Sequence, residues 1–431
     1  MFDIIFAMKI YKRRIFDDIL KDALEAKGAV LIQGPKWCGK TTTAEQMAQS
    51  VLYMSDPEKT EQNLLVAETK PSMLLKGDSP KLIDEWQIAP KLWDAIRFDI
   101  DHSDHLGKFI LTGSAVPADR TKIQHTGTGR FAWLTMRPMS LFESNESTGS
   151  VSLQKLFSSN IDLGESCSHT LESIAFLACR GGWPQSIDMK EKPALRQAFD
   201  YVDAITNNDI SRVDKIQRDP TIARRLMKSL ARLQGTQSAV KVILADMSPH
   251  QTKEFHENTI HAYIGALKKI FVVEDMEAWC PNLRCKTPIR TSDTRYFSDP
   301  SIATAALGLG PEELMDDLPT FGIIFETLVI RDLRTYAAAL DGNVYHYKDK
   351  SGLECDAVIH LRNGKYGLVE IKLGGERLIE EGVKTLNKLA SEIDTKRMRH
   401  PSFKMIIVAT GDFAYQRPDG VIVCPIGALC P

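Results

Sequence analysis

The sequence predicts an α/β protein made of a parallel sheet, a helical connector and a second α/β domain. A short apolar run at 28–33 leads through a glycine-rich loop into a helical segment. Residues 171–280 place apolar side chains three and four positions apart, which is typical of helices. Two apolar strands then flank Asn363-Gly364, a hairpin signal. We expect four segments, with these bounds: 9–145, 146–215, 216–310 and 311–431.

Length, charge and composition limit the classes of protein that the sequence allows. The 431 residues are enough for roughly three domains. A net charge of −2 gives no whole-chain attraction to nucleic acid or membrane, so such binding must be local. No apolar run approaches the roughly 20 residues of a spanning helix, and the opening MFDIIFA lacks the features of a signal peptide; Met8 is an alternative start. The eight cysteines form no CxxC pair, so we expect reduced thiols in a cytoplasmic protein without a membrane partner.

The loop GPKWCGKT at 34–41 has the spacing G-x-x-x-x-G-K-T. Gly34 and Gly39 let backbone amides curl around phosphate oxygens, and Lys40 adds a charge beside the β and γ phosphates. Thr41 offers its hydroxyl to Mg²⁺, and Thr42 follows in the first turn of the helix, whose N-terminus faces the anion. The motif predicts a site for ATP and Mg²⁺. A plain glycine-rich turn is the alternative interpretation.

An acidic strand end and a polar strand end follow. In PKLIDEWQ, at 80–87, Asp84 is expected to hold Mg²⁺ through water, and Glu85 to polarise the attacking water as general base. The alternative is that both acids only begin the next helix. In GKFILTGSA, at 107–115, Thr112 ends another buried strand, from which it could sense the γ-phosphate.

Arginines come next, in GTGRFAWLTMRPMSLFE at 127–143. Arg130 stands at the head of a strand and is a candidate arginine finger or sensor that stabilises transition-state charge. A surface arginine at a strand end is the competing interpretation, and Arg137 is a weaker candidate. A finger that acts on a neighbouring subunit would require a homo-oligomer.

These motifs, in this order, resemble a family of bacterial and archaeal AAA-type ATPases that carry a fused, uncharacterised C-terminal domain. The resemblance continues through GGWPQSI, RYFSDPSIA and FGIIFETLVIRDL and covers roughly residues 9–375. It implies a sheet with an additional strand beside the nucleotide loop, and Glu85 as the catalytic glutamate. Trp37 and Cys38 are unusual residues for such a loop.

The connector has a winged-helix outline, because three helical segments within 221–276 precede an expected hairpin through Trp279 and Tyr296. The resemblance implies the same fold. Basic residues on these segments could meet the phosphates of a nucleic acid; they are Arg224, Arg225, Lys228, Arg232, Lys268, Lys269, Arg284, Lys286, Arg290 and Arg295. A solvated basic face or a protein-docking surface is the alternative. Protein partners are not indicated by any motif.

The hairpin at 352–372 has two conceivable registers. A two-residue turn would mix charged residues into the apolar face, whereas a three-residue turn at 362–364 with a left-handed Gly364 separates the two. The second register pairs Asp356 with Glu370 and Glu354 with Lys372. It predicts one face that is wholly apolar, with Cys355, Ala357, Ile359, Leu361, Val369, Ile371 and Leu373.

That register gathers Asp356, Glu370 and Lys372 on one side. The two carboxylates could hold Mg²⁺, and the lysine could stabilise charge on a scissile phosphate. The cluster is similar to a restriction-endonuclease-like core, with Glu326 as the helical acid. A cross-strand salt-bridge ladder, or a site that binds without cutting, is the alternative.

Three hypotheses of function follow. In the first, Mg²⁺-dependent ATP hydrolysis drives the winged-helix and nuclease-like half on nucleic acid. In the second, the protein is a metal-dependent nuclease gated by ATP. In the third, it is a nucleotide switch that acts through protein partners.

Overall fold

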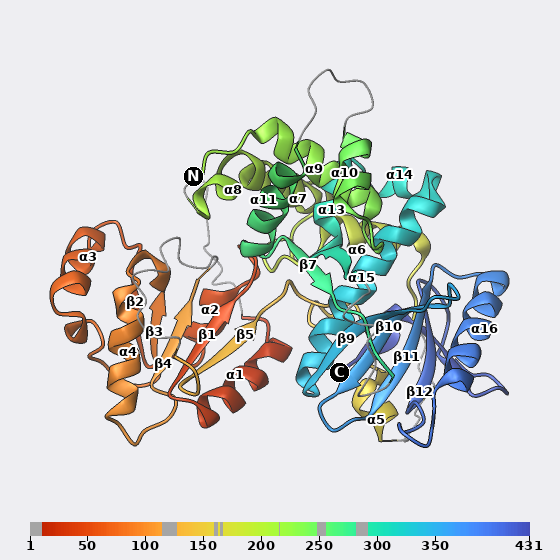
Figure 1. The fold of residues 1–431 in the computed structure, drawn as a ribbon, viewed down its shortest axis with the longest axis horizontal. Helices are drawn as coiled ribbons and strands as arrows, with labels where there is room; N and C mark the ends of the chain where they lie inside the picture. Colours follow the sequence, from red (N-terminus) through yellow and green to blue (C-terminus); the bar gives the residue numbers. More distant parts are fainter. Residues whose placement is uncertain are drawn as a thin grey trace, which may run out of the picture.

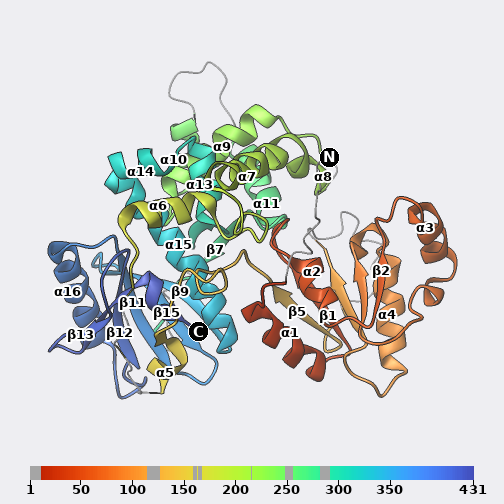
Figure 2. The ribbon, with the colours of Figure 1, turned by 180° about the vertical axis from the view of Figure 1, so that it is seen from behind.

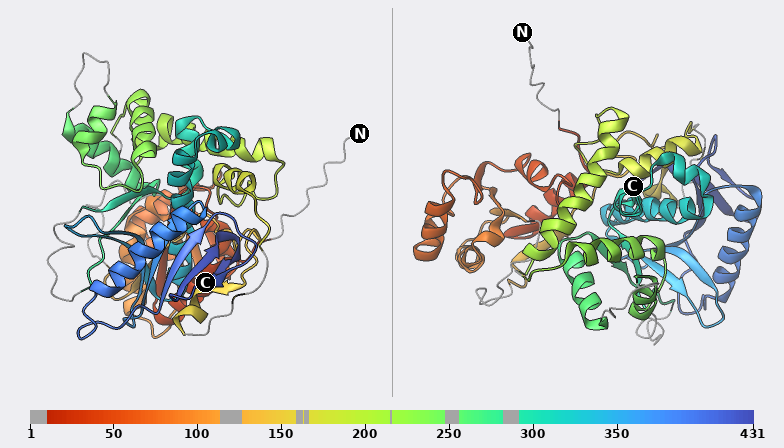
Figure 3. Two further views of the ribbon diagram at one scale, coloured as in Figure 1. Left: turned by 90° about the vertical axis from the view of Figure 1, so that its right-hand side faces the viewer. Right: turned by 90° about the horizontal axis from the view of Figure 1, so that it is seen from above.

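A computed structural model describes residues 11–113, 127–158, 163, 167–214, 216–247, 256–281 and 292–431. An N-terminal domain and a C-terminal domain lie side by side, and the helical connector covers the junction between them (Figure 1). Seen from above, the yellow-green helices of the connector cross from one domain to the other (Figure 3). None of the helices in these residues combines the length and the apolar character that crossing a membrane needs.

The N-terminal domain is a sheet between two layers of helices. Its strands are β1 Ala29–Gln33, β2 Ser50–Tyr53, β3 Lys81–Asp84, β4 Phe109–Thr112 and β5 Phe131–Thr135. Its helices are α1 Ile15–Ala26, α2 Lys40–Glu45, α3 Thr60–Thr69 and α4 Lys91–Asp101, with short 3₁₀ turns at Pro71–Met73 and Trp86–Ile88. The strand order is β2-β3-β4-β1-β5 and every pairing is parallel.

The strands alternate their side chains between the two helical layers. Val30 and Ile32 share a buried cluster with α1 and α2, while Ala29 and Leu31 share another with α3 and α4. The expected additional strand is confirmed: β4 lies between β1, which precedes the glycine-rich loop, and β3, which carries the acids. The helix that follows the glycine-rich loop is short and ends at Glu45, and the chain from Ser50 onward pairs with β3 as an edge strand.

The connector is helical up to a two-stranded sheet. Its helices are α6 Leu171–Arg180, α7 Glu191–Ala204, α8 Ile210–Arg212, α9 Pro220–Leu233, α10 Val240–Met247, α11 Glu257–Lys269, α13 Pro300–Leu307 and α14 Pro311–Asp316. A π-helical turn, Ile205–Asp209, joins α7 to α8. Strands β7 Val273–Met276 and β8 Thr294–Phe297 pair antiparallel. The third predicted helix therefore ends earlier than expected, since residues up to Met276 form β7.

The C-terminal domain is a mixed sheet with one long buried helix. The helices are α15 Leu318–Ala339 and α16 Glu376–Glu392. The strands are β9 Gly342–Lys348, β10 Glu354–Leu361, β11 Tyr366–Lys372, β12 Phe403–Val408, β13 Tyr415–Gln416 and β14 Val421–Pro425, in the order β13-β14-β12-β11-β10-β9. The strands and helices fit the second α/β domain that the sequence predicts.

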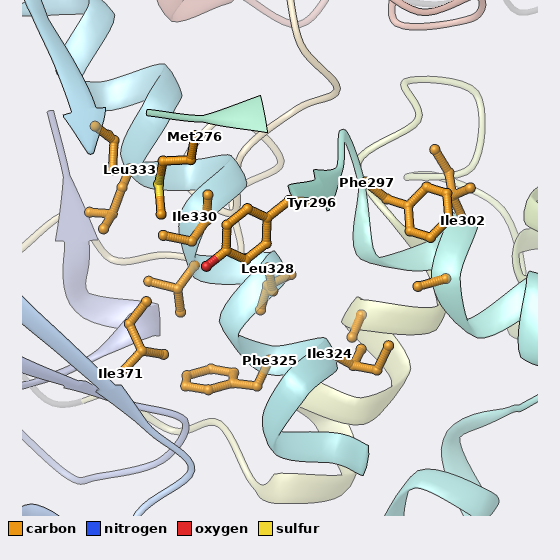
Figure 4. Close-up of a cluster of buried hydrophobic side chains, with 14 of the residues drawn as sticks. Met276, Tyr296, Phe297, Ile302, Ile324, Phe325, Leu328, Ile330, Leu333 and Ile371 are labelled. Carbon is orange, nitrogen blue, oxygen red and sulfur yellow. The ribbon is translucent and has the colours of Figure 1, made fainter. Parts of the chain in front are cut away.

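Helix α15 joins the connector and the C-terminal domain through one hydrophobic core. Phe325 and Leu328 pack among side chains from β8 and β11, including Tyr296 and Ile371 (Figure 4). Truncating such a fully buried aromatic side chain typically costs about 3–5 kcal/mol. The two segments predicted as 216–310 and 311–431 thus share a core, and the boundaries of the four segments remain predictions.

The chain that leaves the N-terminal domain also packs on the C-terminal domain. Strand β6 Val151–Ser152 pairs parallel with β15 Leu429–Cys430, which follows the 3₁₀ turn Ile426–Ala428. Helix α5 Leu153–Phe157 comes next and lies at the base of the C-terminal domain (Figure 2). Phe157 meets Phe403 of β12 edge to face. The start of the segment predicted as 146–215 therefore belongs to the C-terminal layer.

Candidate functional site

A cavity of about 760 Å³ opens at the carboxyl ends of the parallel strands, where ligands bind in open α/β sheets. It is lined by the glycine-rich loop, by Glu85, by the N-terminal segment from Tyr11 to Arg14 and by the connector loop at 184–188. The predicted site residues that line it directly are Gly39, Lys40, Thr41, Thr42 and Glu85. The predicted nucleotide-loop residues are therefore gathered around one cavity.

The loop has a backbone that glycine permits. Gly39 has φ of +100°, and Gly34 has φ of +150°, with a Cβ there only 2.0 Å from the carbonyl oxygen of Met136. Lys40 is buried, and its Nζ donates to the carbonyl oxygens of Gly34 and Pro35 at 3.0 and 2.7 Å. These contacts hold the ammonium inside the loop, where phosphate oxygens would meet it.

Asp84 ties the loop to two strands. Its Oδ1 accepts hydrogen bonds from Thr41 Oγ1 at 2.7 Å and from Thr112 Oγ1 at 2.6 Å. A hydroxyl and a carboxylate side by side are hard oxygen ligands of the kind that Mg²⁺ takes. The residues present fit the predicted ion. The Thr112 hydroxyl donates its hydrogen bond to Asp84, so Thr112 would sense the γ-phosphate through this carboxylate.

Glu85 is the second acid at this strand end. It has a left-handed backbone, with φ of +54°, which is uncommon for a residue other than glycine and turns the chain into the short 3₁₀ turn that follows. Burial raises the pKa of its carboxyl group, and so does the charge of Asp84, whereas a hydrogen bond from Gln87 and the charges of Lys40 and Lys36 lower it. Its carboxyl group lines the cavity.

Arg130 lies at the opposite edge of the sheet from this cavity. It immediately precedes β5, and β5 begins level with the start of β1, whereas the loop follows the end of β1. Its Nε donates to Asp101 at 2.7 Å, and the side chain is half exposed. Arg130 is not among the residues that line the cavity of its own chain, so action on another subunit and a surface arginine at a strand end remain the two interpretations. Arg137 is held by Glu274, with Nη2 at 2.9 Å.

The sequence reasoning missed the N-terminal segment. The guanidinium of Arg14 is buried and donates to Glu143 Oε1 and to the carbonyl oxygen of Cys38, both at 2.9 Å. Tyr11 contacts Thr43 of α2. The basic run KIYKRR at 9–14 received no functional role in the sequence analysis, and no spacing rule connects it with the loop. Only the fold brings them together.

The predicted register of the C-terminal hairpin is confirmed. Ala357 pairs with Val369 and His360 with Tyr366, and Gly364 is left-handed with φ of +82°, as a three-residue turn requires. Two details were wrong. A register shift between Cys355 and Val358 places Cys355 in the buried cluster under α16, and Glu354 pairs with Lys348 of β9, away from Lys372.

Asp356, Glu370 and Lys372 do lie together. Lys372 Nζ is 2.7 Å from Glu370 Oε2 and 3.1 Å from Asp356 Oδ2, which also accepts from the amide of Ile371. Burial raises the pKa of Glu370, and the charge of Asp356 raises it too. The helical acid Glu326 behaves alike: burial and Asp356 raise its pKa, and Tyr296 donates to it at 2.5 Å.

This acidic cluster is arranged as an ion-pair network. The ammonium of Lys372 stands between the two carboxylates that were predicted to hold Mg²⁺, and Glu370 is almost fully buried. Among the residues that the structure describes, no three His, Cys, Asp or Glu side chains are placed to hold a metal ion. The residues as they stand do not fit a preformed metal centre.

The basic residues of the connector are largely paired with acids. Arg224 contacts Asp203, Arg232 contacts Asp246, and Lys268 and Arg295 both contact Asp275, while Lys269 contacts Asp214. Arg284, Lys286 and Arg290 lie outside the described residues. This pairing favours the solvated face over a free phosphate-binding surface.

Comparison with known families finds matches for three stretches of the chain. Residues 26–145 match the model of the AAA domain, residues 171–313 match a domain of unknown function (DUF8612), and residues 321–429 match another (DUF4143). Together with the parallel sheet and the loop, the first match defines the N-terminal part as a P-loop domain of the AAA type. No curated protein matches this chain.

Solved structures show distant likenesses. The Walker-type ATPase PABY2304 of Pyrococcus abyssi matches with a TM-score of 0.42 and 14% identity, covering 69% of this chain and 96% of that chain. The ORC2 protein of Aeropyrum pernix, in ADPNP-ADP complexes, matches with a TM-score of 0.30 and 14% identity, covering 73% and 94%. Scores this low do not carry an argument about function.

Proposed function

We propose that the protein binds ATP with Mg²⁺ and hydrolyses it. The observation that carries the proposal is one cavity lined by the glycine-rich loop and by Glu85, in which Thr41 of the lining is hydrogen-bonded to the Asp84 carboxylate. The loop amides and Lys40 would bind the β and γ phosphates, since a curled glycine-rich backbone at a helix N-terminus is an anion site. Thr41 and Asp84 would hold Mg²⁺, which neutralises charge on the phosphates when bound.

Glu85 would orient the attacking water and accept its proton. The charge of Lys40 lowers the pKa of its carboxyl group, and Glu85 lies at the strand end beside Asp84. Arg130 would complete the site of a second copy of the chain, so the active form would be a homo-oligomer. The cycle would move the connector and the C-terminal domain, because connector residues line the same cavity.

Replacing Glu85 by Gln tests this assignment. The Glu85→Gln protein should bind ATP with Mg²⁺ as the unaltered protein does, because the amide keeps the shape of the carboxylate, and its turnover should fall at least a hundredfold. Equilibrium binding measures the affinity for ATP, and phosphate release measures turnover. Turnover that survives the change would show that Glu85 is not the base.

A second candidate function is metal-dependent cleavage of nucleic acid by the C-terminal cluster. It is favoured by one observation, the gathering of Glu326, Asp356, Glu370 and Lys372 with raised pKa values on both glutamates. Mg²⁺ would have to displace Lys372 from both carboxylates. DNA and RNA incubated with Mg²⁺ and the protein, or its Glu370→Ala variant, test it. The absence of any product that depends on Glu370 would leave the cluster as an ion-pair network.

A nucleotide switch that acts through protein partners is the remaining alternative. It would share the ATP site but show slow turnover. The pairing of the connector's basic residues with acids favours it over nucleic-acid binding. Unchanged DNA affinity in a protein with Arg225 and Lys228 both replaced by Glu would support this alternative.

A further inference from the structure

Lys36 occupies an unassigned position in the glycine-rich loop, and its side chain crosses from the loop to the connector. Its Nζ lies 2.7 Å from Asp209 Oδ1. The lysine side chain is 43% exposed and lines the nucleotide cavity, whereas the aspartate side chain is 11% exposed. The ion pair therefore spans the edge of the cavity, with the ammonium on the accessible side.

The connector is shaped to reach this part of the loop. Asp209 closes the π-helical turn between α7 and α8, and π turns are often retained at functional positions. The neighbouring loop residue Trp37 has a left-handed backbone with φ of +66°, and its ring centroid lies 5.3 Å from that of Tyr201 on α7. Two adjacent loop residues are thus held by the same segment of the connector.

Lys36 and Glu85 line the same cavity. The charge of Lys36 lowers the pKa of Glu85, less strongly than the hydrogen bond from Gln87 and the charge of Lys40 do. The other cations of the lining are engaged elsewhere. Arg14 donates to Glu143 and to loop and strand carbonyls, and Lys12 pairs with Asp188.

A terminal phosphate would compete well for this ammonium. It carries more charge than one carboxylate and offers three acceptor oxygens, and charge-assisted hydrogen bonds are about twice as strong as neutral ones. Lys36 also needs little movement, because its side chain is already in the lining. Releasing Asp209 would remove one of two contacts that join this segment of the connector to the loop, so the connector would respond to the third phosphate.

We propose that Lys36 is a second phosphate-binding lysine, specific for the terminal phosphate of the nucleotide, and that Asp209 is the partner it leaves on binding. The inference rests on the proposed ATP site and adds to it. It names the residue that distinguishes a nucleoside triphosphate from a diphosphate, and the carboxylate that links this choice to the connector.

The test measures the affinity of the full chain, with Mg²⁺, for a non-hydrolysable ATP analogue and for ADP. Lys36→Gln should weaken binding of the ATP analogue about tenfold or more and binding of ADP less than threefold. The lost charge-assisted contact is made to the third phosphate, which ADP lacks. Lys36→Arg should keep most of the preference. The matched control is Lys91→Gln, because Lys91 is 46% exposed and pairs with Glu68 on the surface of the same domain.

Asp209→Asn should change the nucleotide affinity in the opposite direction. Removing the carboxylate that pairs with Lys36 should raise the affinity for the ATP analogue more than the affinity for ADP. This gain should vanish in the double variant with Lys36→Gln. Equal weakening of both nucleotides by Lys36→Gln, or a gain from Asp209→Asn that persists in the double variant, would overturn the proposal. If the unaltered protein binds neither nucleotide, the proposed ATP site itself fails; if it binds both and Lys36→Gln leaves their ratio unchanged, only this inference fails.

Discussion

The hydroxyl of Thr41 donates a 2.7 Å hydrogen bond to Oδ1 of Asp84, although the two residues lie on different elements and 43 positions apart. The same oxygen accepts from Thr112, so one carboxylate joins the start of α2 to the ends of β3 and β4. The arrangement leaves the second oxygen of Asp84 outside these two bonds. A cation held by Thr41 and Asp84 would sit between the loop and the end of β3.

Asp84→Asn should raise the Mg²⁺ concentration that supports half-maximal ATP turnover by about tenfold or more. Asparagine keeps the shape and one acceptor, so the threonine bonds survive, but the negative charge that attracts the ion is lost. A Mg²⁺ titration of turnover at saturating ATP checks this. The control is Asp18→Asn, which removes an exposed carboxylate on α1 that pairs with Arg13. An unchanged Mg²⁺ requirement would rule Asp84 out as a determinant of ion binding.

Arg130 should act between subunits. A mixture of Arg130→Ala, which keeps its loop, with Lys40→Ala, which keeps its arginine, should turn over ATP faster than the sum of the two proteins alone. Arginine fingers supplied from another chain are worth roughly 10³-fold or more in turnover. The mixed activity should also rise with protein concentration.

The control for this prediction is Arg97→Ala. Arg97 binds the same Asp101 carboxylate as Arg130, at 2.7 Å, but lies on α4. Its loss should leave turnover and its concentration dependence unchanged. If the mixture shows only the sum of its parts, Arg130 is a surface residue that caps a strand.

His346 should make stability depend on pH. Burial lowers the pKa of this histidine to about 4, from an ordinary value near 6.5. Between these values the unfolded chain binds more protons than the folded one, so the free energy of unfolding should fall by roughly 2–3 kcal/mol as the pH drops from 6.5 to 4. His346→Gln should remove that part of the slope, measured by urea unfolding at several pH values, while His102→Gln at an exposed site should not. Identical slopes in all three proteins would contradict the burial argument.

The N-terminal domain was predictable because its signals are local. A strand, a glycine-rich loop and a helix adjoin at 28–45, and parallel strands bring their carboxyl ends to one edge, which places Asp84 and Thr112 beside Thr41. The register of the hairpin at 352–372 was equally decidable, since a slip by one residue would bury charges. In the loop and in the hairpin the deciding residues are close in sequence, and the common direction of parallel strands accounts for the placement of Asp84 and Thr112.

What could not be predicted depends on distant contacts. The edge strand β2 reads as the end of a helix until β3 pairs with it. Arg14 and Asp209 reach the nucleotide loop only because the chain folds back, and the shift that moves Cys355 to the other face comes from pairing with β9. Propensity and periodicity carry no record of such contacts.

The proposed ATPase activity is tested most directly by steady-state phosphate release from ATP with Mg²⁺, using the unaltered protein and Lys40→Ala side by side. The ammonium of Lys40 is buried within the loop, so its loss should reduce turnover to the level of a protein-free control. Turnover in the unaltered protein that disappears in Lys40→Ala is the predicted result. Equal turnover in the two proteins would show that the loop at 34–41 is not the site of hydrolysis.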